Sequence, residues 1–259
     1  MTLRNPARER LVKGELSLGI GLRQARTVDT AAIMATCGYD WLFIDLEHGT
    51  MPLDTAVQIS CAALTAGITP LVRVPSGQYA LATRALDGGA LGIVMPHVDT
   101  ADEAKAVVDH LKYAPLGHRS VAGGQAFLGF RPVPLAEATR TINDESLVVV
   151  MLETPQAIAN AEAIAAVPGV DVLLIGTNDL AMEMGLPGQF GHAEVARAYE
   201  RVIAACRRHG KWPGMGGVYV EDLQAKYIGL GMRMILSGND LSLMMAGATQ
   251  RTKFLRGLS

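Results

Sequence analysis

The sequence is poor in cysteine, has no excess of either charge and contains no long hydrophobic run. Its three cysteines, Cys37, Cys61 and Cys206, cannot all pair and lack the close spacing of a metal site. We therefore expect buried free thiols in a reducing compartment. The 23 basic residues stand against 25 acidic ones, and this formal net charge of -2 excludes the basic footprint of a nucleic-acid-binding protein.

What the sequence lacks also argues against membrane insertion, secretion and disorder. No stretch approaches the roughly 20 consecutive apolar residues that span a bilayer. The N-terminal segment MTLRNPARERLVKG is charged where a signal peptide would need an apolar core. Apolar residues make up 49% of the chain, too many for a disordered protein. We expect a cytoplasmic enzyme that binds no membrane.

What is present is an alternation of short apolar runs with longer amphipathic segments, many of which end at a glycine. The predicted strands are 17–21, 41–45, 70–74, 91–94, 147–152, 172–175, 214–218 and 232–236. The predicted helices are 30–37, 53–66, 79–87, 101–111, 155–166, 194–209, 220–229 and 240–256. Eight strand–helix repeats without a break in composition favour the α/β class, as one TIM (β/α)8 barrel domain over 1–259.

A doubly wound parallel sheet is the competing α/β architecture. It would usually carry a glycine-rich phosphate fingerprint after its first strand, and the stretch GIGLR at 19–23 lacks the third glycine. One segment, 113–145, is too long for an ordinary connection. Because long insertions in compact domains are often functional, we expect this segment to help cover the site.

Two carboxylates directly follow apolar strands, where a barrel places its catalytic groups. Glu153 and Asp179 would be costly there as unpaired buried charges and would repel each other. A divalent cation resolves both problems, and oxygen ligands indicate Mg²⁺ or Mn²⁺, with Co²⁺ and Zn²⁺ as further candidates. The alternative is structural, with Glu153 capping the next helix and Asp179 capping a turn.

Two further strand ends carry groups suited to proton transfer and anion binding. His48 lies three residues after Asp45, and a carboxylate can orient an imidazole for acid/base catalysis. The alternative is a histidine that only packs or caps. Arg73 ends the apolar run of the third strand and would bind a carboxylate or oxyanion. Alternatively, it would form an internal ion pair with Glu47 or Asp45.

The sixth strand leads into a helix start at Asn178 and Asp179, whose backbone N–H groups are suited to a small anion. Together with the groups above, they indicate a small, oxygen-rich anionic substrate held beside a metal.

Six segments, in order along the chain, carry a family likeness. They are GYDWLFIDLEHG (38–49), LVRVP (71–75), VMPHVDTADEA (94–104), PLGHRSVAGG (115–124), MLETPQAIAN (151–160) and VDVLLIGTNDLAMEMG (170–185). On these segments the chain resembles the HpcH/HpaI family of class II, metal-dependent pyruvate aldolases, which cleave or form 4-hydroxy-2-oxo acids. The resemblance implies a TIM barrel, commonly assembled as a hexamer with the last helix exchanged between subunits.

The resemblance also implies roles for individual residues. The metal carboxylates match Glu153 and Asp179, the pyruvate-binding arginine matches Arg73, and the acid/base pair matches Asp45 and His48. The backbone contacts to the pyruvate carboxylate match Asn178 and Asp179. An acidic residue that supports the histidine, in one arrangement from across a subunit boundary, matches Asp87. Arg119 matches a position near the aldehyde end of the substrate.

One position departs from the family pattern. Many members carry a glutamine that touches pyruvate two residues before the metal glutamate, and here that residue is Met151. A methionine side chain donates no hydrogen bond, so a less polar or roomier 2-oxo acid donor becomes conceivable.

The implied chemistry passes through an enolate that a divalent cation stabilises. Arg73 would hold the developing oxyanion and His48 would move protons. Oxaloacetate decarboxylation would be a side reaction, since it gives the same enolate. No lysine ends a predicted strand, which argues against a Schiff-base aldolase. The rivals are a citrate-lyase-like enzyme acting on a CoA thioester and a non-catalytic binding barrel.

Overall fold

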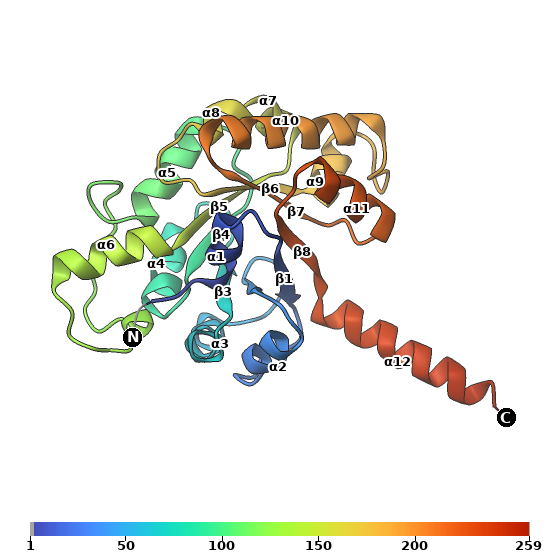
Figure 1. Cartoon of the computed structure of the whole chain (residues 1–259), viewed down its shortest axis with the longest axis horizontal. Helices are drawn as coiled ribbons and strands as arrows, with labels where there is room; N and C mark the ends of the chain where they lie inside the picture. The colour runs from blue at the N-terminus through green and yellow to red at the C-terminus, as the bar shows by residue number, and fades with distance from the viewer. Residues whose placement is uncertain (1–2, 259) are drawn as a thin grey trace.

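The computed structural model describes residues 3–258, and within them eight parallel strands pair in sequence order and close into a barrel (Figure 1). β1 also pairs with β8, so the sheet has no open edge and is not doubly wound. The predicted TIM barrel is therefore confirmed. Residues 1, 2 and 259 of the predicted domain lie outside the described residues.

The strands are β1 (Ser17–Leu22), β2 (Trp41–Asp45), β3 (Thr69–Arg73), β4 (Gly92–Met95), β5 (Leu147–Leu152), β6 (Val172–Gly176), β7 (Trp212–Gly216) and β8 (Met234–Asn239). The helices are α1 (Pro6–Val12), α2 (Thr30–Thr36), α3 (Leu53–Ala66), α4 (Tyr79–Asp87), α5 (Ala101–Leu111), α6 (Leu135–Glu145), α7 (Pro155–Ala159), α8 (Ala161–Ala165), α9 (Thr177–Glu183), α10 (Ala193–His209), α11 (Glu221–Leu230) and α12 (Asp240–Arg256).

Strand side chains alternate between two cores, because successive residues of a strand point to opposite faces of the sheet. Leu42 and Val150 belong to the core between the strands and the helices, whereas Phe43 and Met151 belong to the core inside the barrel. Every residue of β5 is buried, as expected for a strand covered on both faces. By the same alternation, the last inward-facing side chain at the C-terminal end of each strand lies at the barrel mouth.

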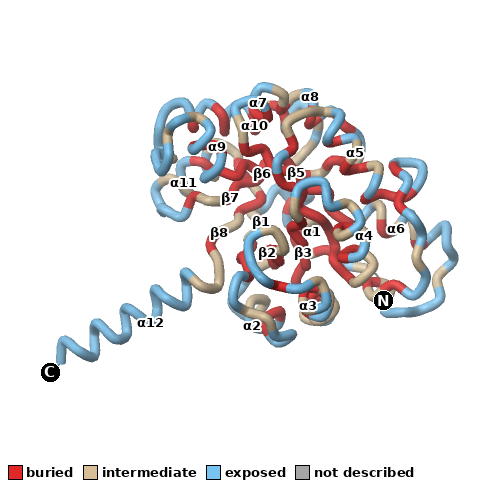
Figure 2. The backbone as a smooth tube through the Cα atoms, turned by 180° about the vertical axis from the view of Figure 1, so that it is seen from behind, coloured by how far each residue is buried: buried red, intermediate tan, exposed pale blue. Residues whose placement is uncertain are grey.

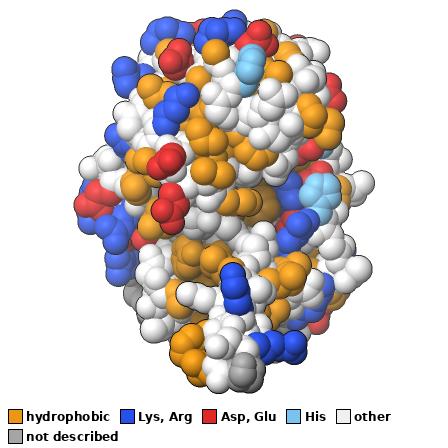
Figure 3. Space-filling model, turned by 90° about the vertical axis from the view of Figure 1, so that its right-hand side faces the viewer, with side chains coloured by type: hydrophobic (Ala, Val, Ile, Leu, Met, Phe, Trp, Pro, Cys, Tyr) orange, Lys and Arg blue, Asp and Glu red, His pale blue; other side chains and the backbone are white. Residues whose placement is uncertain are grey.

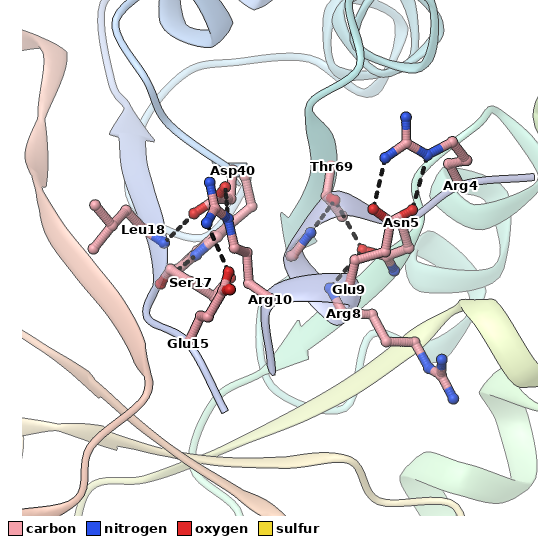
Figure 4. A network of polar contacts seen from close by, with 12 residues as sticks. Arg4, Asn5, Arg8, Glu9, Arg10, Glu15, Ser17, Leu18, Asp40 and Thr69 are labelled. Atoms are coloured by element: carbon pink, nitrogen blue, oxygen red, sulfur yellow. Dashed lines mark hydrogen bonds and ion pairs between the residues drawn. The ribbon is translucent and has the colours of Figure 1, made fainter. Parts of the chain in front are cut away.

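Helix α1, which the sequence pattern did not reveal, packs against the opposite end of the barrel (Figure 4). The buried side chain of Asn5 caps α1 by accepting a hydrogen bond from the Arg8 N–H at 3.1 Å. It also accepts one from the Thr69 hydroxyl at 2.8 Å and donates one to the Glu145 carbonyl at 2.6 Å. Leu11 then packs into the core inside the barrel.

Helix α12 extends away from the barrel into solvent (Figures 1 and 2). None of its residues is buried, although several are large and apolar. Apolar and basic side chains gather around the C-terminal end of the chain in Figure 3.

Several predicted elements need correction. The predicted helix 155–166 is divided at Asn160, and the helix start expected at Asn178 and Asp179 belongs to a separate short helix, α9, which is absent from the predicted helices. The segment 113–145 ends in helix α6, which buries Ala138 and Ile142 one turn apart. Cys37 is exposed rather than buried. Across residues 3–258, no helix combines the length and apolar character needed to cross a membrane.

Candidate active site

A cavity of about 280 Å³ opens where the strands of the barrel end. Its lining brings together seven of the residues predicted from sequence, namely Asp45, His48, Arg73, Met151, Glu153, Asn178 and Asp179. They come from β2 and the loop after it, from β3, from β5 and the residue that follows it, and from the first turn of α9, which lie far apart in the chain. Asp45, Arg73 and Glu153 each continue an inward-facing series of their strand, which explains why they converge.

Glu153 is the most deeply buried carboxylate of the cavity, with 1% of its surface exposed. It does not cap the next helix, because the Thr154 hydroxyl performs that role. Its Oε2 instead accepts a hydrogen bond from the His97 backbone N–H at 2.8 Å. Burial, with a smaller contribution from the nearby charge of Asp179, raises the pKa of Glu153 to about 7, against the opposing effects of His97 and Arg73.

A divalent cation fits the Glu153 and Asp179 pair, although only Glu153 is buried and Asp179 is exposed rather than buried as predicted. Burial and the second carboxylate outweigh the effects of His97 and Arg73 on the pKa of Glu153, so the charge of its carboxylate is incompletely compensated. Across the described part of the chain, no cluster of three or more His, Cys, Asp or Glu side chains could hold a metal. Two carboxylates, completed by water and substrate oxygens, are a donor set typical of Mg²⁺.

Glycine at position 176 is what leaves room for the Glu153 carboxylate. A Cβ on Gly176 would lie only 2.5 Å from Glu153 Oε1, well inside van der Waals contact. The end of β6 therefore accommodates the side chain that projects from the end of β5.

Arg73 forms the internal ion pairs that the sequence left as its alternative. Its Nε and Nη2 donate to the two carboxylate oxygens of Asp45 at 2.9 and 2.7 Å. Its Nη1 lies 2.9 Å from Glu47 Oε2, and its guanidinium lies over the Phe43 ring at 4.9 Å. Burial alone would raise the pKa of Asp45, but the hydrogen bonds and charge of Arg73 and two backbone N–H groups lower it.

The contact predicted between the Asp45 carboxylate and the His48 imidazole is replaced by a different one. Asp45 Oδ1 accepts hydrogen bonds from the backbone N–H groups of Glu47 and His48, at 3.1 and 3.2 Å. The imidazole itself is 57% exposed, and its Nε2 lies 3.8 Å from Glu47 Oε2. Asp45 thus shapes the loop that carries His48, while Glu47 is the acidic neighbour of the ring.

Two predicted residues lie away from the cavity lining. Arg119 and Asp87 form an ion pair, with 2.6 Å between Nη2 and Oδ1, and the Arg119 guanidinium lies over the Tyr113 ring. No described residue of the segment 113–145 lines the cavity, so within one chain the expected cover over the site is not formed.

A family model described as HpcH/HpaI aldolase/citrate lyase matches residues 23–246. The chain belongs to this family. It is 43% identical over 239 residues to a 4-hydroxy-4-methyl-2-oxoglutarate aldolase of Chaetomium globosum, covering 91% of this chain and 89% of the relative. It is 38% identical over 242 residues to a 4-hydroxy-2-oxovalerate aldolase of Rhodococcus jostii, covering 93% and 92%.

Solved structures agree with this assignment. The crystal structure of an HpcH/HpaI aldolase from Desulfitobacterium hafniense superposes with a TM-score of 0.91, at 30% sequence identity and with 96% of each chain covered. This HpcH/HpaI chain therefore has the barrel of its family over nearly its full length.

Sequence reasoning missed several residues of this HpcH/HpaI site. His97 has left-handed backbone geometry with φ of 53°, unusual for a residue other than glycine, and its Nδ1 lies 3.4 Å from Glu153 Oε2. Arg23 and Tyr219 line the cavity from the loops after β1 and β7. The available signal was their position directly after a strand, since each of these three follows a strand end by one to three residues.

Proposed function

We propose that this chain is a class II aldolase that reversibly cleaves 4-hydroxy-2-oxo acids to pyruvate, or a related 2-oxo acid, and an aldehyde. The observation that carries the proposal is the buried Glu153 carboxyl next to Asp179, in a cavity that also holds Arg73 and His48. This combination suits a reaction in which negative charge develops on an oxygen beside a metal site.

The cleavage breaks the C3–C4 bond of the substrate. The electron pair of this bond passes to the 2-oxo acid half as an enolate, and the C4 hydroxyl loses its proton to become a carbonyl. A divalent cation held by Glu153 and Asp179 would act as a Lewis acid toward the enolate oxygen. Mg²⁺ or Mn²⁺ suits these oxygen ligands.

The residues of the chain provide anion binding and proton transfer. Arg73 has five N–H groups, of which two donate to Asp45 while its Nη1 forms an ion pair with Glu47, so N–H groups of the guanidinium remain to donate to the oxyanion. His48, exposed at the mouth, accepts the hydroxyl proton in its neutral form and returns a proton to the enolate carbon. Met151 in the lining leaves one wall without a hydrogen-bond donor, which favours a tolerant 2-oxo acid pocket.

We further propose a cytoplasmic homohexamer in which α12 is exchanged between subunits. The apolar residues of this helix have no covering surface in one chain. Asp87 and Arg119 do not line the cavity of their own chain, and the Asp87 side chain is 36% exposed. We propose that Asp87 supports the histidine of a neighbouring subunit and that Arg119 lies near the aldehyde end of the substrate.

The test of the aldolase proposal separates metal-dependent from lysine-dependent catalysis. Exhaustive treatment with EDTA should abolish cleavage of 4-hydroxy-2-oxovalerate, and added Mg²⁺ or Mn²⁺ should restore it. Borohydride with pyruvate should trap no covalent adduct by mass spectrometry. Pyruvate methyl protons should exchange with deuterated solvent in the metal-loaded protein. Activity that survives full chelation would contradict the proposal, and a protein with neither metal nor exchange would be a non-catalytic barrel.

A further inference from the structure

A pair of buried hydroxyl groups lies at the start of α9 and has no part in the mechanism above. Thr177 is the first residue of α9, directly before Asn178 and Asp179, and it borders the cavity. Its hydroxyl lies 2.6 Å from the hydroxyl of Tyr199, which belongs to α10. Both side chains are fully buried. Helix α10, outside the barrel, is thus in direct contact with the turn that carries part of the site.

The direction of these hydrogen bonds follows from the number of hydrogens. The Thr177 hydroxyl has a single hydrogen, which it donates to the Gly216 carbonyl at 2.7 Å. Thr177 must therefore accept a hydrogen bond from the phenol of Tyr199. Burial raises the pKa of Tyr199, so the phenol stays protonated and remains a donor. The hydrogen bonds thus lead from Tyr199 through Thr177 to the last residue of β7.

The start of α9 needs an anchor of this kind because it lacks an ordinary cap. Gly176 occupies the N-cap position and has no side chain that could accept a hydrogen bond from the N–H groups of the first turn. The helix has only seven residues, too few to be stable by itself. Contacts with the rest of the barrel must therefore decide where this turn lies.

Gly217 packs closely against the same turn from the loop after β7. A Cβ on Gly217 would lie 2.9 Å from Asn178 Nδ2 and 3.2 Å from the Asn178 backbone nitrogen. Two successive residues at the end of β7 and just after it therefore contact two successive residues of α9. The Tyr199 hydroxyl adds the contact from α10, so the turn is held from two different elements.

The first turn of α9 carries groups that the proposed reaction needs. Asp179 would supply one of the two carboxylates for the divalent cation, and the N–H groups of Asn178 and Asp179 would bind the carboxylate of the 2-oxo acid. The Asp179 side chain is exposed, so its own packing does not fix it, and its position depends on the backbone of the turn. A shift of this backbone would change both metal binding and substrate binding, since metal affinity depends on how the ligands are oriented.

We propose that Tyr199 is a positioning residue, which holds the first turn of α9 in place through the Thr177 hydroxyl. Tyr199 acts only through Thr177 and takes no part in bond breaking. This inference rests on the proposed aldolase function, because it assigns Tyr199 a task toward the cation and the 2-oxo acid. Packing alone would need only the ring, which stacks on the Tyr227 ring with 3.7 Å between centroids. The hydroxyl is the part that serves the site.

The experiment removes the hydroxyl and keeps the ring. Tyr199→Phe should weaken Mn²⁺ binding to the substrate-free protein by about 10-fold in isothermal titration calorimetry, the lower end of the range for groups that orient metal ligands. With Mn²⁺ at saturation, Y199F should raise KM for the exchange of pyruvate methyl protons by about threefold or more and keep kcat within about twofold. Thr177→Val should weaken Mn²⁺ binding at least as much as Y199F. T177S, which retains the hydroxyl, should stay within about threefold of wild type.

The matched control is Tyr227→Phe, in the same ring stack. The Tyr227 hydroxyl donates to the Phe190 carbonyl, in the loop between α9 and α10, rather than to Thr177. Both variants lose one hydrogen bond of a tyrosine hydroxyl, so their urea midpoints should fall by similar amounts, whereas Y227F should keep Mn²⁺ affinity within about threefold of wild type.

Equal Mn²⁺ affinities of Y199F and Y227F would overturn the proposal while the aldolase function stands, because the hydroxyl of Tyr199 would then serve stability alone. If Y199F does not fold, T177V and T177S decide the question, and equal affinities of these two would overturn the proposal as well. Wild type that binds no Mn²⁺ and exchanges no pyruvate protons would instead remove the aldolase proposal and the role of Tyr199 with it.

Discussion

Asp45 and Arg73 form a buried pair in which each residue depends on the other. Asp45 is 4% exposed and Arg73 is 8% exposed, and their bidentate contact satisfies both groups. Removing one member of such a pair leaves the other charged and unpaired in a poorly solvated place. The pair also fixes the orientation in which Arg73 presents its remaining N–H groups to the cavity.

Asp45→Asn should destabilise the protein at neutral pH by about 3 kcal/mol, the range for breaking a buried ion pair. Because the folded pKa of Asp45 lies below its usual value of 3.8, the charged carboxylate contributes stability above that pH. This contribution is lost as the pH falls below 3.8 and through the folded pKa. Urea unfolding of wild type and D45N between pH 3 and 7 should show a difference that shrinks only toward the acidic end.

The exposed carboxylate of Asp54 provides the control for that series. D54N should differ from wild type by less than about 0.5 kcal/mol at neutral pH, as surface substitutions usually do. A D45N deficit that stays constant down to pH 3 would refute the coupling between Asp45 ionisation and stability.

Gly176→Ala should impair the site while leaving the barrel folded. The added methyl group would lie 2.5 Å from Glu153 Oε1, so the carboxylate must move. We expect a loss of divalent metal affinity of more than about 10-fold, measured by calorimetry, since orientation of metal ligands typically controls affinity by 10- to 100-fold. An unchanged metal affinity would show that metal binding does not depend on the position of the Glu153 carboxylate.

The matched variant is Gly216→Ala, one strand away. Gly216 is the register partner of Gly176 in the β6–β7 ladder. A Cβ added to Gly216 would lie 3.4 Å from the nearest atom, a side-chain carbon of Leu236. That is an ordinary contact, so G216A should keep metal affinity within about threefold of wild type.

At the scale of elements, α1 shows how a short segment closes a barrel. Its two buried apolar residues are too few to produce a clear amphipathic pattern, and its N-cap depends on groups from distant parts of the chain. Asn5 connects α1 to β3 through Thr69 and to the end of α6 through the Glu145 carbonyl. The helix is therefore stabilised by tertiary contacts more than by local preference.

Asn5→Ala should lower the free energy of unfolding by about 2 to 4 kcal/mol. The substitution removes the N-cap and leaves the Thr69 hydroxyl and the Glu145 carbonyl short of a partner in a buried place. Chemical denaturation measures the change, with Gln189→Ala at an exposed site as the reference variant. A stability loss no larger than that of Q189A would mean that α1 contributes little to the barrel.

At the scale of the whole molecule, α12 is the element that one chain leaves uncovered. Leu243 and Phe254 are 50% and 59% exposed on a helix with no buried residue. Exposed apolar groups gathered in this way are typical of an interaction surface. Subunit exchange would bury them and would bring neighbouring barrels together.

If the proposed oligomer forms through α12, the double substitution Leu243→Glu with Phe254→Glu should shift the protein from that oligomer to monomers. Two charges on the covered face would each cost several kcal/mol of association free energy if they became buried unpaired. Light scattering after size exclusion measures the mass, and Thr252→Glu on the same helix should keep the wild-type mass. A double variant that remains fully assembled would refute exchange of α12, and a monomeric wild type would do the same.

Much of the fold could be predicted because its signals are local. β2, α3, α4 and α12 begin and end where periodicity, glycine stops and apolar runs place them. β7 was misplaced by two residues because Trp212, Pro213 and two glycines give a weak strand pattern. The site residues Glu153 and Arg73 were found for the same local reason, since each lies at or directly after an apolar run.

The sequence by itself determined the repeat of strand and helix, and with it the barrel and the inward series that ends in Asp45, Arg73 and Glu153. Only the tertiary structure decided which groups contact each other at the mouth. Glu47, rather than Asp45, lies beside the His48 imidazole, and the Arg23 backbone N–H donates to Asp240 at the start of α12. Strand position follows from periodicity along one segment, whereas contacts at the mouth depend on side-chain directions from loops far apart in the chain, which no local pattern encodes.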